Sequence, residues 1–172
     1  PKNLDETTEQ PRNKDSLDRF VQDHYEFDKR QLLGLTEQGF SNENWQTMAV
    51  LGWLGVSIPE AHGGFGGNQI DTMILMEAFG KGLVLEPFFA STVLGAKAIA
   101  DGGNEELKTQ MLPGVVDGSR QLTFAYAEPQ SRFDLEDIVT RAQEDGDGYI
   151  INGHKSMVLH AASAHQIVVS TR

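Results

Sequence analysis

The amino-acid sequence predicts an α+β protein in which an all-α helical domain is followed by an antiparallel β domain. Two observations carry this prediction. Up to about residue 118, apolar residues recur at helical spacing, and glycine-rich turns separate the apolar stretches. From Gln121 onward, apolar and polar residues alternate with a period of two, as in strands that bury one face. We therefore expect a boundary near Gly118, with domains at 1–118 and 119–172.

Five helices are expected before this boundary. The first carries an apolar stripe at helical spacing, and two of the later ones begin at residues whose side chains can cap a helix. Glycine or proline follows the helical pattern in most of them and marks its end. The expected segments and signals are 17–25 with the stripe Leu17, Phe20, Val21 and Tyr25; 41–52 with the cap Ser41; 71–82 with the cap Asp71; 87–103; and 104–114, ended by Pro113 and Gly114.

Four strands are expected after the boundary, at 121–126, 138–143, 149–152 and 166–171. The glycines at 144–148 supply the positive backbone angles that a hairpin turn requires between the second and third strands. The sequence stops directly after an apolar strand, which leaves a sheet edge to be paired or covered. We therefore expect this sequence to be part of a larger protein.

Composition argues against several classes of function. The 172 residues carry a formal net charge of −11, which disfavours a surface for nucleic acid or anionic membranes. The chain contains no cysteine, so it can form no disulfide, thiolate metal site or cysteine nucleophile. No apolar stretch reaches the length of a membrane span, and no signal peptide is recognised. A cytoplasmic protein with no nucleic-acid partner and no membrane insertion is expected.

Three motifs suggest ligand sites, and each has a simpler structural explanation. The glycine-rich segment 62–71 lacks the Lys-Ser/Thr pair of a phosphate loop, and no strand precedes it. The acidic run 144–147 lacks the spacing of a calcium loop and suits a hairpin turn. The spacing of His154, His160 and His165 matches no common metal-ligand pattern, so no metal site is expected.

The end of the first strand is a stronger candidate site. Glu128-Pro129 breaks the alternating pattern, because proline fixes its own backbone angle and donates no hydrogen bond to a sheet. The backbone groups exposed at such a strand end require partners. They either hold a flat polar ligand or leave the sheet into an ordinary loop.

Three segments together resemble the acyl-CoA dehydrogenase family. They are LGWLGVSIPEAHGGFGGNQID at 51–71, EELKTQMLPGVVDGSRQLTFAYAEP at 105–129 and GDGYIINGHKSMVLHAASAHQIVVSTR at 146–172. Each motif alone is weak, but their order and spacing agree with the family from about Leu17 to Arg172. The resemblance implies that a C-terminal helical bundle follows the β domain and that the present sequence is truncated before it.

This resemblance implies a flavoenzyme. The family binds flavin adenine dinucleotide (FAD) and oxidises an acyl-CoA thioester to the 2,3-enoyl thioester. A carboxylate removes the α-proton, and the β-hydride passes to the flavin. In the family that carboxylate lies in the later helical domain, so no residue of this chain is assigned as catalytic. We therefore expect the chain alone to be inactive.

The resemblance also implies which residues meet the flavin. The family pattern aromatic-x-x-Thr-Glu-Pro falls on 124–129, with Ala127 in place of the threonine, and Arg132 and Phe133 replace the Gly-Ser that follows. The family's Trp-Ile-Thr falls on 157–159, so its tryptophan and threonine side chains are absent. Backbone contacts remain available, because every non-proline residue carries N–H and C=O groups. The implied flavin contacts are Phe124, Tyr126, Ala127, Phe133, Met157, Val158 and Leu159.

Further segments resemble one bacterial subgroup, the small subunits of pimeloyl-CoA dehydrogenase type. They are YEFDKRQ at 25–31, EPQSRFDLEDI at 128–138 and VLHAASAHQIVVSTR at 158–172. This resemblance implies an acyl-CoA substrate and a homo- or hetero-oligomer with a related dehydrogenase subunit. Two alternatives stay open: a catalytically degenerate partner subunit with a structural role, and an acyl-CoA oxidase on the same scaffold.

Overall fold

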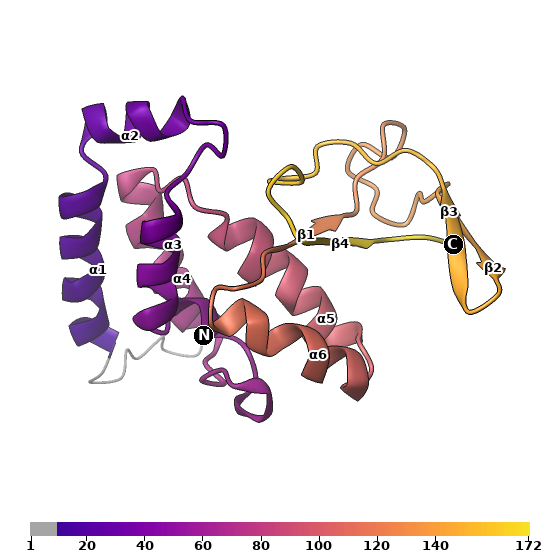
Figure 1. The fold of residues 1–172 in the computed structure, drawn as a ribbon, viewed down its shortest axis with the longest axis horizontal. Coiled ribbons are helices and arrows are strands. Elements are labelled where there is room, and N and C mark those ends of the chain that lie inside the picture. The colour runs from indigo at the N-terminus through magenta and orange to yellow at the C-terminus, as the bar shows by residue number, and fades with distance from the viewer. Residues whose placement is uncertain (1–9) are drawn as a thin grey trace, which may run out of the picture.

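The structure is a computed structural model that describes residues 10–172, and it confirms the α+β class. Helices form one part of the molecule and two small sheets form the other (Figure 1). The helical elements are α1 (Gln10–His24), α2 (Phe27–Gly34), α3 (Asn42–Val50), η1 (Trp53–Gly55), η2 (Glu60–His62), α4 (Gln69–Gly82), the π-helix η3 (Phe89–Ala96), α5 (Lys97–Gly102) and α6 (Glu105–Val116).

The helical core forms around the predicted apolar stripe of α1. Leu17 and Phe20 of this stripe are buried, and they belong to the same cluster as Trp45 and Met48 of α3. The indole N–H of Trp45 also donates a hydrogen bond to the carbonyl of Gly118 at 2.9 Å. The core of the helical part is thereby tied to the segment that leads into the strands.

Helix ends were predicted with mixed success. Ser41 caps α3 as predicted, since its hydroxyl accepts a hydrogen bond from the N–H of Asn44 at 3.1 Å. The prediction that Asp71 caps α4 is wrong, because Asn68 caps this helix and Asp71 lies three residues later. The Asp71 carboxylate accepts a hydrogen bond from the N–H of Asn68 and so completes a reciprocal capping box.

Two other helical features differ from the prediction. Helix α6 continues through Pro113 and Gly114 to Val116, since a proline in the last turn removes only one helical hydrogen bond. Helix α2 was not predicted, because none of its residues is buried and its sequence therefore lacks an apolar stripe. The residue pattern therefore predicted neither the exact end of α6 nor the exposed helix α2.

The strands form two separate pairs. Strands β2 (Arg141–Asp145) and β3 (Gly148–Asn152) form the predicted antiparallel hairpin, with Gly146 at a φ of 60° in its turn. Strands β1 (Leu122–Ala125) and β4 (Gln166–Val169) pair in parallel, whereas we expected antiparallel pairing throughout. The long connection between β1 and β4 contains the whole hairpin, which gives the chain the length that a parallel crossover requires.

Strand β1 is buried on both faces. Helix η3 packs against it, and the hydroxyl of Ser91 accepts a hydrogen bond from the N–H of Leu122 at 3.0 Å. Thr123, on the other face, is fully buried despite its polar side chain. The alternating pattern thus predicted the strand correctly, but neither of its faces is open to solvent. Strand β1 lies between the helical part and the loops of the β part (Figure 1). Within residues 10–172, no helix combines the length and apolar character needed to cross a membrane.

The contact between η3 and β1 gives a stability prediction at Gly95. A Cβ at this position would lie 2.7 Å from the Cβ of Leu122, closer than side chains normally approach. We expect Gly95→Ala to lower the free energy of unfolding by about 1–3 kcal/mol, measured by urea denaturation. The matched control is Gly80→Ala in α4, where a Cβ would meet nothing within 4 Å. This control is expected to raise stability by roughly 0.5–1 kcal/mol, and equal effects of the two variants would contradict the prediction.

Candidate functional site

The candidate site begins where β1 leaves its sheet. The carbonyl of Ala125 still accepts a hydrogen bond from the N–H of Ser170 at 3.2 Å. The next two residues leave the ladder, and within residues 10–172 neither the N–H of Tyr126 nor that of Ala127 has a hydrogen-bond partner. The carbonyl of Ala127 is used, because it accepts from the N–H of Ser156 at 2.9 Å. The strand end therefore presents two free backbone donors.

The second candidate segment, 157–159, lies directly beside this strand end. The Ser156–Ala127 hydrogen bond holds the start of the segment, and the hydroxyl of Thr123 donates to the carbonyl of Leu159 at 2.7 Å. Val158 is partly buried, whereas Leu159 is 42% exposed and Met157 is 83% exposed. Met157 also has a φ of 54°, a left-handed conformation that is uncommon for a residue other than glycine. The structure thus brings together two segments that are about thirty residues apart.

The aromatic candidates divide into two groups. The rings of Phe124 and Tyr126 lie 5.6 Å apart, so these side chains support each other along the edge of β1. Phe133 is 99% exposed on the turn after Pro129, and it joins no aromatic pair in the described part of the chain. The structure therefore assembles Phe124 and Tyr126 at the strand end and leaves Phe133 in solvent.

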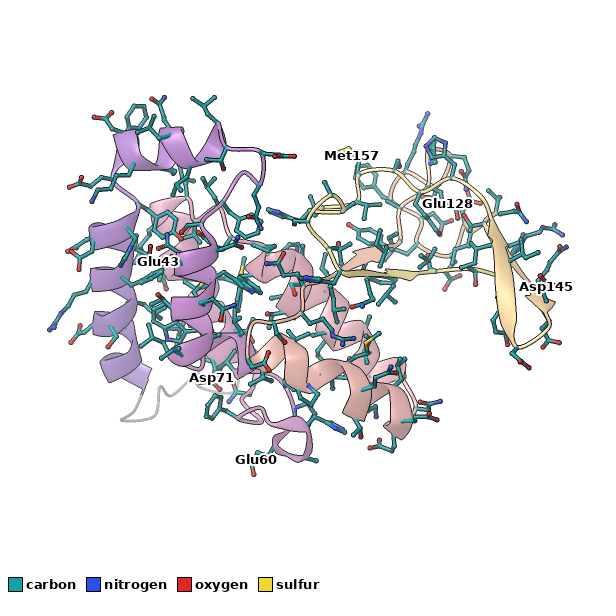
Figure 2. The ribbon with its side chains drawn as sticks, viewed as in Figure 1. Glu43, Glu60, Asp71, Glu128, Asp145 and Met157 are labelled. Carbon is teal, nitrogen blue, oxygen red and sulfur yellow. The ribbon has the colours of Figure 1, made fainter. Side chains whose placement is uncertain are left out.

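A buried ion pair between Glu128 and Lys155 fixes the geometry of the site. The Lys155 ammonium donates to the Glu128 carboxylate at 2.7 Å, and the side chains of both residues are almost completely buried. The same carboxylate accepts hydrogen bonds from the backbone N–H groups of Val139 and Thr140, at 2.9 and 3.1 Å. Lys155 also donates to the hydroxyl of Ser170 at 2.8 Å. Figure 2 shows Glu128 in the β part of the molecule, near the loop that carries Met157.

Burial and hydrogen bonding act in opposite directions on Glu128. Burial alone would raise the pKa of its carboxyl group, but hydrogen bonds from Lys155, Thr140 and Val139 outweigh that effect. The net result is a pKa well below the ordinary value of a glutamate, so Glu128 is ionised at neutral pH. The sequence analysis used Glu128 to mark the end of the first strand and included Lys155 only within a family segment, and it missed their pairing.

A cavity of about 690 Å³ lies next to the second segment. One wall is formed by the loop between α2 and α3, and the other by residues that follow Leu159. The ring of His160 stands against that of Phe40, with centroids 6.0 Å apart. The lining residues are Thr36, Glu37, Gln38, Phe40, Asn42, His160, Ala162 and Ser163.

The remaining candidate motifs have structural explanations. Gly64 lies so close to the backbone of Ile58 that a Cβ would overlap the Ile58 carbonyl, so this glycine serves loop packing. The Nδ1 atom of His165 accepts a hydrogen bond from the N–H of Gln121 at 2.9 Å, which ties β4 to the start of β1. Among the described residues, no group of three or more His, Asp or Glu side chains is placed to hold a metal ion.

Family models agree with this arrangement of segments. The acyl-CoA dehydrogenase N-terminal domain matches residues 7–119, and the acyl-CoA dehydrogenase middle domain matches residues 123–172. The chain belongs to the acyl-CoA dehydrogenase family. It is therefore related to a family of oxidoreductases, as the resemblance in the sequence implied.

Individual relatives agree with this membership. Acyl-CoA dehydrogenase FadE12 of Mycobacterium tuberculosis is 33% identical over 135 residues, which cover 77% of this chain and 34% of that protein. A solved variant of the Tcur3481-Tcur3483 steroid ACAD is 32% identical with a TM-score of 0.84, covering 95% of this chain and 44% of that one. A solved FAD-dependent dehydrogenase is 29% identical with a TM-score of 0.78, and the match covers 99% of this chain and 44% of that one. The chain thus spans about a third of the curated relative and less than half of each solved chain.

The Glu128 ion pair predicts a specific loss of stability in acid. A carboxylate whose pKa is lower in the folded state stabilises the fold above the unfolded-state pKa of about 4.3, and this contribution is lost as the pH falls below that value. We expect Glu128→Gln to be less stable than the parent at pH 7 and to lose less stability between pH 6 and pH 3. Urea midpoints at several pH values measure this difference.

The control for this prediction is Glu106→Gln, which changes an exposed carboxylate of α6. This variant should keep the pH dependence of the parent. A Glu128→Gln variant whose urea midpoint falls with pH as steeply as that of the parent would show that the ion pair contributes no pH-dependent stability.

Proposed function

We propose that this chain forms part of the flavin and acyl sites of an acyl-CoA dehydrogenase that oxidises an acyl-CoA thioester to the 2,3-enoyl-CoA. The observation that carries the proposal is the strand end of β1, where the free N–H groups of Tyr126 and Ala127 lie beside the segment 157–159. We propose domains at 1–118 and 119–172 and a cytoplasmic location, both from the sequence patterns described above.

The strand end suits a flat, polar ring system such as the flavin of FAD. Two backbone donors can meet the pyrimidine edge of the ring, while Met157 and Leu159 offer exposed apolar surface to its face. When bound, FAD would supply the acceptor for the hydride that leaves the β-carbon of the acyl group. The residues of this chain would bind and orient the ring, and Lys155 with Glu128 would hold the two contact segments in register.

In this proposal the acyl group enters the cavity at His160. It begins one residue after Leu159, so a ligand in it would lie next to the proposed flavin surface. Its volume of about 690 Å³ is within the range of small-molecule pockets. The placement of substrate next to flavin is what a hydride transfer requires, because the reacting atoms have to come within about 3–3.5 Å.

The two absent threonine hydroxyls support a second candidate function. Ala127 and Leu159 stand where the family has threonines, and the exposed Met157 replaces a tryptophan. A chain with these changes could keep the fold as a partner subunit of a heteromeric dehydrogenase and bind flavin weakly. An acyl-CoA oxidase would use the same flavin and acyl sites and would pass its electrons to oxygen.

Restoring the two hydroxyls tests the proposed flavin site. A hydrogen bond is worth about 0.5–1.5 kcal/mol net, so Ala127→Thr with Leu159→Thr is expected to tighten flavin binding by roughly 10- to 100-fold. Titration with FAD, followed by visible absorbance and by flavin fluorescence, measures the affinity. An unchanged dissociation constant would mean that these side chains face no flavin.

A matched control adds the same hydroxyls elsewhere. Ala142 and Ile151 are paired across the β2–β3 hairpin, away from the strand end, so Ala142→Thr with Ile151→Thr should leave flavin affinity unchanged. Tighter binding by this control as well would show that added threonines act through general stability and not through the site.

The assignment of the base gives a further prediction. The family resemblance implies that a carboxylate of the later helical domain removes the α-proton. No residue of the present chain is assigned as this base. The purified chain loaded with FAD is therefore expected not to bleach the flavin absorbance when octanoyl-CoA is added without oxygen. Rapid bleaching would show that a carboxylate of this chain serves as the base.

A further inference from the structure

We infer that the cavity at His160 selects neutral acyl groups and rejects acyl groups that end in a carboxylate. This inference rests on the proposed function, because it assumes that the acyl group enters this cavity. It concerns the distal end of the substrate, away from the thioester.

Most polar groups of the cavity wall are already paired with one another. The side-chain amides of Gln38 and Asn42 donate to each other, at 3.0 and 2.8 Å. The hydroxyl of Thr36 donates to the carbonyl of Leu33 at 2.7 Å, and the hydroxyl of Ser163 donates to the carbonyl of His160 at 3.2 Å. Each of the two amides keeps a second N–H donor, but none of these groups carries a positive charge that would compensate a ligand carboxylate.

Two ionisable side chains of the wall remain without a hydrogen-bond partner. Within the described residues, neither the carboxylate of Glu37 nor the ring nitrogens of His160 make a hydrogen bond or ion pair. Burial lowers the pKa of the His160 imidazole, so the ring is uncharged at neutral pH. The apolar surface comes from Phe40 and Ala162.

The charge of the wall is therefore negative. Its eight lining residues include one carboxylate, Glu37, and no lysine or arginine. A substrate carboxylate in this cavity would exchange part of its hydration for the neighbourhood of a like charge, and the wall offers no cation to compensate it. A neutral acyl group meets none of these penalties, and one that carries a hydroxyl or carbonyl group could also form a hydrogen bond with the imidazole of His160.

The wall that carries Glu37 and Phe40 is held in place from inside the helical part. The buried carboxylate of Glu86 accepts hydrogen bonds from the hydroxyl of Tyr25 and from the N–H of Ser41, the latter at 3.1 Å. Phe40, next to Ser41, is only 3% exposed. Because the loop is anchored at Phe40 and Ser41, its backbone keeps Glu37 at the wall of the cavity.

This inference separates the chain from the substrate that its subgroup resemblance suggests. A pimeloyl thioester ends in a carboxylate, which this wall disfavours. The resemblance at 25–31, 128–138 and 158–172 would then reflect a shared scaffold and not a shared substrate.

The test compares two CoA thioesters of similar length: octanoyl-CoA has an eight-carbon acyl chain that ends in a methyl group, and pimeloyl-CoA has a seven-carbon chain that ends in a carboxylate. Dissociation constants for the purified protein are measured by isothermal titration calorimetry at pH 7.5. We expect octanoyl-CoA to bind about tenfold more tightly. We expect Glu37→Gln to remove most of this preference by strengthening pimeloyl-CoA binding alone, and Glu37→Lys to reverse it.

The control variant is Glu60→Gln. Glu60 is exposed at the far end of the helical part from Met157 (Figure 2), so this change should leave the preference intact. Equal binding of the two thioesters by the parent protein, or an unchanged preference in Glu37→Gln, would overturn the inference and leave the proposed function standing. Failure of both thioesters to bind would instead contradict the proposed acyl site itself.

Discussion

The buried ion pair between Glu128 and Lys155 is the interaction on which the β part depends. It joins four separate pieces of chain: the end of β1, the backbone before β2 at 139–140, the segment after β3 and the end of β4 at Ser170. Neither two-stranded sheet is large enough to be stable by itself. A buried charge requires a partner and further hydrogen bonds. The folded structure can therefore bury this ion pair only when these four segments come together.

The proposed ligand surface follows from this constraint. With Glu128 and Lys155 fixed, the residues before and after them, Ala127 and Ser156, come within hydrogen-bonding distance, and the segment 157–159 lies along β1. The free donors at this surface belong to the backbone. A surface built in this way tolerates changes of side chain, so the flavin site that we propose does not depend on the two threonines that Ala127 and Leu159 replace. Side-chain contacts then tune the affinity.

The helical part contributes rigidity in a comparable way. Burial raises the pKa of the Tyr25 hydroxyl and the adjacent Glu86 carboxylate raises it further, so Tyr25 stays protonated and donates to that carboxylate. Asn44 donates to the same hydroxyl at 3.0 Å. This network anchors the loop that lines the cavity at His160, while Ser91 of η3 ties the helices to β1. The wall of the cavity and the strand end are thus both connected to the same helical core.

The sequence by itself determined the change from helices to strands, the buried stripe of α1, the Ser41 cap and the β2–β3 hairpin, because periodicity and turn residues act over a few positions. It also located the strand end at 126–129, since proline and the change of pattern are local signals. Only the tertiary structure decided the parallel pairing of β1 with β4, the Asn68 cap, the pairing of Glu128 with Lys155 and the cavity between 36–42 and 160–163. Most of these features join residues far apart in the chain, and their partners depend on how the helices and loops pack.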